Sequence, residues 1–101
     1  MGLFSFLFGN KNNKIKDFAK RGAIIVDVRY KAEYASGAIP GSKHIDLKDI
    51  PNQANSIKNW NLPIITCCLS GGRSGRAAKI LKQHNIEVIN GGGWQSLYKK
   101  L

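Results

Sequence analysis

The chain has 101 residues, of which 43% are hydrophobic, and this is enough for one domain with a single hydrophobic core. Its 16 Lys and Arg face only 6 Asp and Glu, so the formal charge at pH 7 is +10, which favours anionic substrates or surfaces. The basic residues match no nucleic-acid-binding motif, so we interpret them as a solvated surface and expect no nucleic-acid partner. No apolar run is long enough to cross a membrane.

The chain begins with an apolar segment, Met1 to Phe8, which is followed by a polar run of Gly, Asn and Lys. We therefore divide the chain into an N-terminal segment with its linker, residues 1–12, and a folded domain, residues 13–101. The segment lacks the basic start of a secretory signal, and Phe6 stands where a myristoylation signal needs Ser or Thr. Two alternatives stay open. The segment docks on the domain's own apolar surface, which we prefer, or it makes a weak contact with a membrane or a partner.

Helical and strand patterns alternate through the rest of the chain. A first helix is predicted over 13–21, with Asn12 or Asn13 as its N-cap and Gly22 at its end. The segment 23–28 contains a continuous apolar run, which is typical of a strand covered on both faces. Further helices are predicted over 31–36, 47–58 (or an irregular turn), 74–84 and 94–100, and further strands over 43–46, 64–66 and 87–89, with a turn at 91–93. This alternation predicts an α/β fold with a mostly parallel central sheet flanked by helices on both faces.

The two cysteines, Cys67 and Cys68, are adjacent, and neighbouring residues rarely form a disulfide. Free thiols are typical of a reducing compartment, so we expect a cytoplasmic protein. Successive side chains of a strand point to opposite faces, so only one of the two thiols can enter the loop that follows, and the other belongs in the core. The Cys, His, Asp and Glu residues show no metal-ligand spacing, and we expect no cofactor.

The residues that carry chemistry lie between Pro63 and Leu81, where a predicted strand, a tight loop and a predicted helix follow one another. The glycines of the loop Cys68–Arg73 let its backbone curl, so that its N–H groups converge at the start of the helix and can hold an anion. A thiol reacts as the thiolate, which is favoured near a helix N-terminus and near an arginine. The stretch therefore predicts a nucleophilic sulfur in a site for negative charge.

Three motifs of the chain resemble those of one known family. The segment Cys68–Ser74 resembles the active-site loop of single-domain rhodanese-type sulfurtransferases, Cys-x-x-Gly-x-Arg-Ser. Asp27-Val28-Arg29, followed by Glu33-Tyr34 and by Gly37–Ser42, resembles the family's Asp-Val-Arg, Glu-Tyr and Gly-His-Ile-Pro-Gly-Ala signature. Gly92-Gly93-Trp94 resembles the Gly-Gly-aromatic turn before the family's last helix. The matches occur in the family's order from roughly Lys14 to Leu101, which identifies nearly the whole chain as rhodanese-like.

The resemblance implies a sulfurtransferase that acts through a persulfide on Cys68. A small anionic donor such as thiosulfate supplies the sulfur, cyanide or a thiol accepts it, and the protein is expected to be a monomer. Asp27 and Arg29 are implied to support the loop, with Arg29 pairing with Glu33. The residues implied to bind the substrate are Leu69, Ser70, Gly71, Gly72, Arg73 and Ser74.

Some roles within this site have alternatives. Arg73 either holds the anionic substrate, which the resemblance favours, or closes the loop structurally. Ser74 either donates to the bound sulfur or is only the N-cap of the next helix. Arg76 either guards the entrance or is merely solvated. Trp94 is best interpreted as core packing.

The chain also departs from the family pattern. Ala38 stands where the family usually has His, and Leu97 replaces an aromatic residue. The strand that commonly opens the fold is hard to find, although residues 3–8 could supply it. These departures concern support and stability rather than the Cys68 loop.

Two other functions stay open. Counted from Cys67, the loop reads Cys-x5-Arg-Ser, which resembles the signature of cysteine-dependent phosphatases. The glycine spacing from Cys68 and the absence of a His before Cys67 argue against that alternative. The other is a non-enzymatic rhodanese module that binds a partner protein or a membrane.

Overall fold

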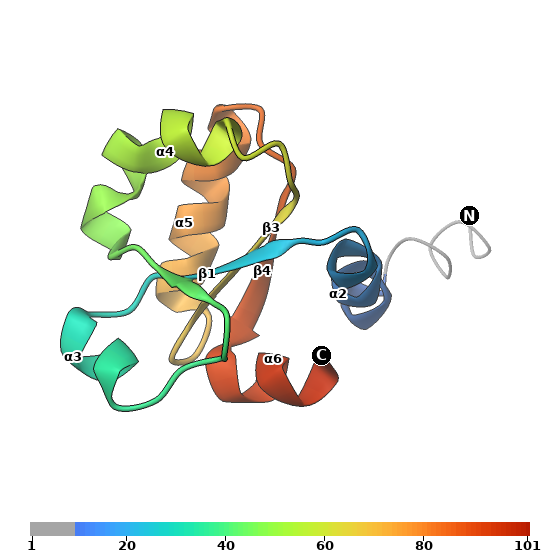
Figure 1. The fold of residues 1–101 in the computed structure, drawn as a ribbon, viewed down its shortest axis with the longest axis vertical. Coiled ribbons are helices and arrows are strands. Elements are labelled where there is room, and N and C mark those ends of the chain that lie inside the picture. The colour runs from blue at the N-terminus through green and yellow to red at the C-terminus, as the bar shows by residue number, and fades with distance from the viewer. Residues whose placement is uncertain (1–9) are drawn as a thin grey trace.

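Helices and strands alternate through residues 10–101, the part of the chain that the computed structural model describes (Figure 1). The helices are α2 (Lys11–Lys20), α3 (Lys31–Ala35), the 3-10 turn η1 (Leu47–Asp49), α4 (Ile50–Lys58), α5 (Gly72–Gln83) and α6 (Trp94–Lys100). The strands are β1 (Ile24–Asp27), β2 (Lys43–His44), β3 (Ile64–Cys68) and β4 (Val88–Gly93). The expected α/β alternation is therefore present.

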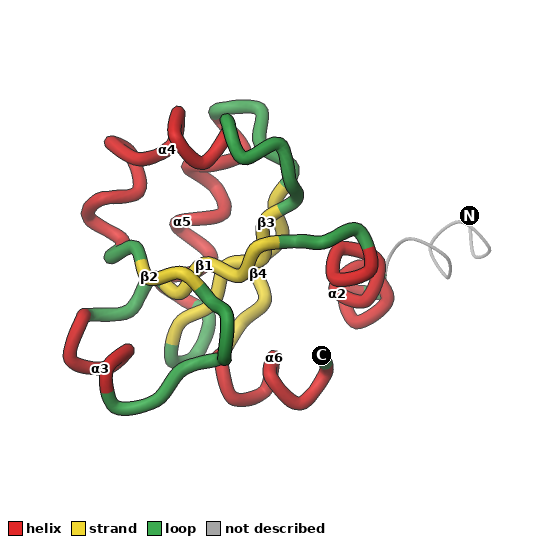
Figure 2. The backbone as a smooth tube through the Cα atoms, viewed as in Figure 1, coloured by secondary structure: helices red, strands yellow, loops and turns green. Residues whose placement is uncertain are grey.

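The four strands form one sheet in the order β2-β1-β3-β4, and every neighbouring pair is parallel (Figure 2). After β1 the chain first adds β2 on one side and then crosses to place β3 on the other. In open α/β sheets, such a reversal of strand order leaves a crevice at the carboxyl ends of the strands, where ligands bind. Here that crevice lies between the ends of β1 and β3.

Each face of the sheet is covered by a different pair of helices, as predicted (Figure 1). Apolar side chains of α4 and α5 pack on one face, and those of α2 and α6 pack on the other. The first core cluster includes Val26, Ile50, Ile57, Ile64 and Leu81. The second includes Ile15, Phe18, Ile65, Cys67 and Leu97. Leu97 is fully buried in the second cluster, so this position of α6 is part of the core.

The helix starts differ from the predicted ones. The N-cap of α2 is Asn10, whose side chain accepts hydrogen bonds from the N–H groups of Asn12 and Asn13 at 2.8 and 3.3 Å, so neither of these two is the cap. Helix α5 begins at Gly72, earlier than expected, because Gly71 takes the N-cap position with a φ of 109° that only glycine adopts easily. Ser74 therefore lies in the first turn of α5 and is not its N-cap.

The predicted turn at Gly91–Gly93 is instead the second half of β4. In the pairing of β3 with β4, Thr66 lies opposite Asn90 and Cys68 lies opposite Gly93, so β4 carries an extra residue there. This bulge has a positive φ of 84° at Gly92. A side chain on Gly93 would lie 2.7 Å from the carbonyl oxygen of Leu69, so the glycines let β4 approach the end of β3 closely.

The apolar segment Met1–Phe8 lies outside the described residues, and so do its predicted docking and the predicted opening strand. Within residues 10–101, no helix combines the length and the apolar character that a membrane span requires.

Candidate active site

The two cysteine side chains at the end of β3 lie on opposite faces of the sheet. Cys67 is fully buried in the cluster formed with α2 and α6, whereas Cys68 lies on the side of α5. This is the alternation that the sequence predicts for neighbouring strand residues. Only Cys68 is placed at the loop that joins β3 to α5.

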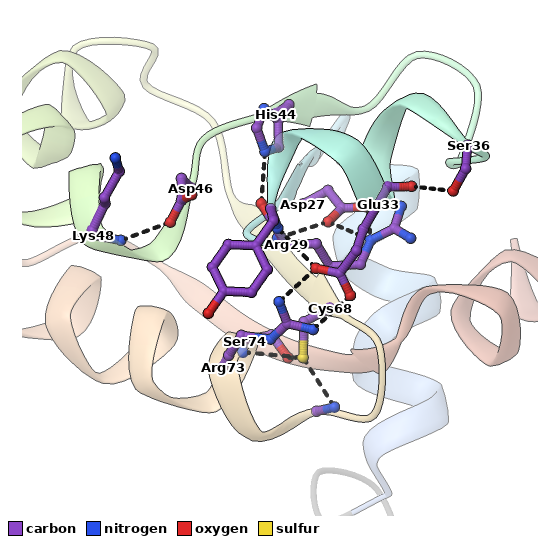
Figure 3. A network of polar contacts seen from close by, with 12 residues as sticks. Asp27, Arg29, Glu33, Ser36, His44, Asp46, Lys48, Cys68, Arg73 and Ser74 are labelled. Carbon is purple, nitrogen blue, oxygen red and sulfur yellow. Dashed lines mark hydrogen bonds and ion pairs between the residues drawn. The ribbon is translucent and has the colours of Figure 1, made fainter.

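The sulfur of Cys68 is surrounded by hydrogen-bond donors of that loop (Figure 3). The backbone N–H groups of Gly71 and Ser74 donate to Cys68 Sγ at 3.1 and 3.3 Å. The hydroxyl oxygen of Ser74 lies 3.3 Å from the same sulfur. The loop thus directs its N–H groups at Sγ, as expected of an anion-holding loop at a helix N-terminus.

These surroundings separate the acidities of the two thiols. Burial disfavours ionisation of Cys68, but hydrogen bonds from the Ser74 hydroxyl and from the N–H groups of Ser74, Gly71 and Ser70 outweigh it and lower the pKa of Cys68. Burial raises the pKa of Cys67 to about 12, and the nearby Asp27 carboxylate adds to the effect. The thiolate therefore forms more readily on Cys68 than on Cys67.

Asn90, in the middle of β4, forms hydrogen bonds to the loop that carries Cys68. Its Oδ1 accepts from the Ser74 hydroxyl at 2.7 Å and from the N–H of Gly92 at 2.9 Å. Its Nδ2 donates to the carbonyl oxygen of Gly71 at 3.1 Å. Asn90 thus fixes both residues that donate to Cys68 Sγ. Asn90 was not among the predicted site residues; the signal in the sequence is a polar amide that directly follows the apolar pair Val88-Ile89.

The Arg73 side chain pairs with Glu33 of α3 (Figure 3). Its two terminal nitrogens donate to the two carboxylate oxygens of Glu33 at 2.7 and 3.1 Å, and its guanidinium stacks on the Tyr30 ring. This contact favours the loop-closing alternative for Arg73. It also shows that the pairing expected between Arg29 and Glu33 is wrong.

Arg29 instead pairs with Asp27, its neighbour at the end of β1, and both are buried. The Arg29 guanidinium also donates to the carbonyl oxygen of Gly37 at 2.7 Å and stacks on the half-buried Trp94 ring. Asp27 and Arg29 thus hold together the end of β1, the loop before β2 and the start of α6. This is a supporting position, and neither side chain contacts Cys68.

The remaining predicted site residues, Leu69, Ser70 and Gly72, lie on the exposed side of the loop. The Leu69 side chain is 60% exposed. Within residues 10–101, no group of His, Cys, Asp and Glu side chains could hold a metal ion. Around Cys68, the site offers a ligand the thiol, backbone N–H groups and the Ser74 hydroxyl.

This combination of fold and loop can be compared with known proteins. The family model described as the rhodanese-like domain matches residues 11–100. The chain belongs to this family. The match covers every helix and strand of the described structure, so the fold implied by the resemblance is confirmed.

Individual relatives agree with this assignment. The thiosulfate sulfurtransferase GlpE of Pseudomonas entomophila is 36% identical over 84 residues, which cover 76% of this chain and 74% of that protein. The putative sulfur carrier protein YrkF of Bacillus subtilis is 42% identical over 67 residues, 65% of this chain but only 36% of that longer protein. The crystal structure of SSP1007 from Staphylococcus saprophyticus superposes with a TM-score of 0.70 at 30% identity, covering 88% of this chain and 90% of that one. At the level of the family, these similarities support sulfur transfer.

Proposed function

We propose that this protein is a sulfurtransferase that carries sulfane sulfur on Cys68. The observation that carries the proposal is the set of donors around Cys68 Sγ, from Gly71 and Ser74, which favours the thiolate. The thiolate is the form that attacks sulfur, and a lowered pKa of the thiol makes this form more available. Relatives named thiosulfate sulfurtransferase support thiosulfate as the donor.

The proposed reaction has two steps. The Cys68 thiolate attacks the outer sulfur of thiosulfate, the Sγ–S bond forms, the S–S bond of thiosulfate breaks and sulfite leaves with the electron pair. Cyanide or a thiolate then attacks the outer sulfur of the persulfide, and Cys68 leaves as the thiolate. Atoms and charges balance in both steps, so no cofactor is required.

The loop would stabilise both states of the sulfur. The N–H groups of Gly71 and Ser74 already donate to Cys68 Sγ. We expect the backbone N–H groups of residues 69–73 to stabilise the outer, anionic sulfur of the persulfide, because such preorganised donors stabilise developing charge. Asp27 and Arg29 would hold the neighbouring strand end in position. Arg73 would order the loop through Glu33 in the free protein. The free thiols agree with the proposed cytoplasmic location.

The geometry speaks against the phosphatase alternative. That mechanism would need Cys67 as the nucleophile at the start of the loop. The Cys67 side chain points into the opposite core cluster, and burial raises its pKa to about 12, so it is neither accessible nor ionised near pH 7.

The test is the intact mass of the protein after treatment with thiosulfate, together with the rate of thiocyanate formation. We expect one added sulfur in the wild type and in Cys67→Ser, and none in Cys68→Ser. Hydrolysis of an aryl phosphate should be negligible. The assignment is wrong if Cys67→Ser loses the added sulfur, or if the wild type hydrolyses the phosphate ester without accepting sulfur.

A further inference from the structure

A groove lies beside the Cys68 loop, at the crevice between the carboxyl ends of the strands. It encloses about 450 Å³ and shares Arg73 with the loop. Its walls come from three segments that each follow a strand. They are Tyr30 after β1, Asp46, Leu47 and Lys48 after β2, and Arg73 and Arg76 on α5 after β3. This volume is typical of sites for organic ligands and exceeds what an inorganic ion such as thiosulfate fills.

Some of the charged side chains in this groove have an interaction partner within the protein, and others form no ion pair. The Arg73 guanidinium is taken up by Glu33, and the Asp46 carboxylate accepts from the N–H of Lys48 at 3.2 Å. In the part of the chain that the structure describes, the side chains of Arg76 and Lys48 form no ion pair. Both are exposed. Two cations are therefore free to meet an anion in the groove.

The groove also has an apolar part. The Tyr30 ring is 63% exposed and stacks on Arg73, and Leu47 lies between Asp46 and Lys48 on η1. Figure 3 draws Asp46 and Lys48 on one side of the view, and Arg73 and Cys68 lower and towards its centre. An organic molecule with carboxylates could place its carbon chain on Tyr30 and its charges on Arg76 and Lys48.

We propose that this groove selects the sulfur acceptor, and that the acceptor is a small thiol bearing carboxylates, held by Arg76 and Lys48. The proposal rests on the proposed function. The acceptor thiolate attacks the outer sulfur of the persulfide on Cys68. The new S–S bond forms, the Sγ–S bond breaks, the negative charge of the outer sulfur stays on the transferred sulfur, and Cys68 leaves as the thiolate.

The proposal concerns the second step only, so the two steps are measured separately. The protein is loaded with thiosulfate, freed of the donor, and its persulfide is confirmed by intact mass. Single-turnover loss of the persulfide is then followed with mercaptosuccinate, 2-mercaptoethanol and cysteamine, which are anionic, neutral and cationic thiols. Each rate is expressed per concentration of thiolate, because the three thiols differ in pKa.

Arg76→Glu and Lys48→Glu test the groove, and Lys16→Glu is the matched control. Lys16 is exposed on α2, which covers the opposite face of the sheet, and its reversal changes the net charge equally. We expect Arg76→Glu to slow transfer to mercaptosuccinate roughly tenfold, and Lys48→Glu to slow it by a smaller factor. Transfer to 2-mercaptoethanol should not change, Lys16→Glu should affect neither thiol, and Arg76→Lys should retain most of the preference.

Three outcomes would overturn the proposal. The first is a wild type that transfers sulfur to the anionic thiol no faster than to the others. The second is a groove variant whose rate with the neutral thiol falls as much as its rate with the anionic thiol. The third is an equal fall in rate in Lys16→Glu, which would assign the effect to the overall charge. If no persulfide forms at all, the proposed function fails first and the acceptor site fails with it. If the persulfide forms but reacts at the same rate with thiols of different charge, only the proposal of the acceptor site is contradicted.

Discussion

The hydroxyl of Ser74 lies 2.7 Å from Oδ1 of Asn90 and 3.3 Å from Sγ of Cys68. It has one proton to donate and faces two acceptors when Cys68 is ionised. When Cys68 is a thiol, its S–H can donate to the Ser74 oxygen while the Ser74 hydroxyl donates to Asn90. When Cys68 is a thiolate, the hydroxyl can turn to the sulfur, and Asn90 Oδ1 still accepts from the N–H of Gly92. Ser74 is thus satisfied in both states of the thiol.

Ser74→Ala should raise the pKa of Cys68, because the thiolate loses the hydrogen bond that the Ser74 hydroxyl donates to it. The thiolate absorbance at 240 nm, taken as the difference from Cys68→Ser, measures that pKa. Ser70→Ala is the matched control, since only the backbone N–H of Ser70 contributes to the lowered pKa. An equal change in both variants would assign the effect to the loop as a whole.

The pH profile of persulfide formation should follow the Cys68 thiolate alone. The pKa of Cys68 lies below the ordinary thiol value, so the rate should rise with pH through that lowered pKa and then level off. The pKa of Cys67 is raised to about 12, so Cys67→Ser should leave the profile unchanged. Initial rates with thiosulfate between pH 4 and 9 test this, and a midpoint at or above that of free cysteine would contradict it.

Much of the fold could be predicted because its signals are local. Apolar runs mark the buried strands, the alternation of elements sets the parallel sheet, and the period of a strand separates Cys67 from Cys68. The contacts that depend on the folded chain could not be predicted in this way. Glu33 meets Arg73 rather than Arg29 because β1 and β3 are neighbours in the sheet, which brings α3 to the start of α5.

Two local signals were misleading for physical reasons. Asn12 and Asn13 are good N-cap residues, but Asn10 precedes them and already accepts from both of their N–H groups. A run of three glycines predicts a turn, yet Gly91–Gly93 continue a strand. Their lack of side chains serves close approach to β3 and not only a change of chain direction.

The ion pair of Glu33 with Arg73 should make the stability of the folded protein depend on pH in the acidic range. The Arg73 guanidinium and the N–H of Tyr30 lower the pKa of Glu33 to about 2. Because the folded pKa lies below the unfolded value, near 4.3, the pair contributes its full stability above that value and loses it as pH falls towards about 2. The melting temperature of Glu33→Gln should therefore lie below that of the wild type at neutral pH, and the gap should shrink between about pH 4.3 and 2.

Arg73→Gln is the control for this pair and should show the same shrinking gap, because either substitution removes the same contact. A gap that stays constant down to pH 2 in Glu33→Gln would mean that the carboxylate contributes through packing rather than through its charge.

Gly91→Ala should destabilise the fold even though alanine is the smallest possible addition. A Cβ at this position would lie 2.7 Å from Ile65 Cγ2, 2.8 Å from Leu97 Cδ2 and 2.8 Å from the carbonyl oxygen of Thr66. Two of these atoms belong to fully buried side chains, so the core must move, at a cost of about 1–3 kcal/mol.

The matched control for Gly91→Ala is Gly72→Ala. A Cβ on Gly72 would meet no atom within 4 Å, and the residue lies at the start of α5, where alanine favours the helix. Denaturant unfolding should therefore place Gly72→Ala at or above the stability of the wild type and Gly91→Ala clearly below it. Because Gly91 is one of the two bulge residues of β4 opposite Cys67, next to the Cys68 loop, Gly91→Ala should also slow persulfide formation in its folded fraction. Equal stability of the two variants would show that β4 can move away from β3 at no cost, and that the close approach does not hold the loop.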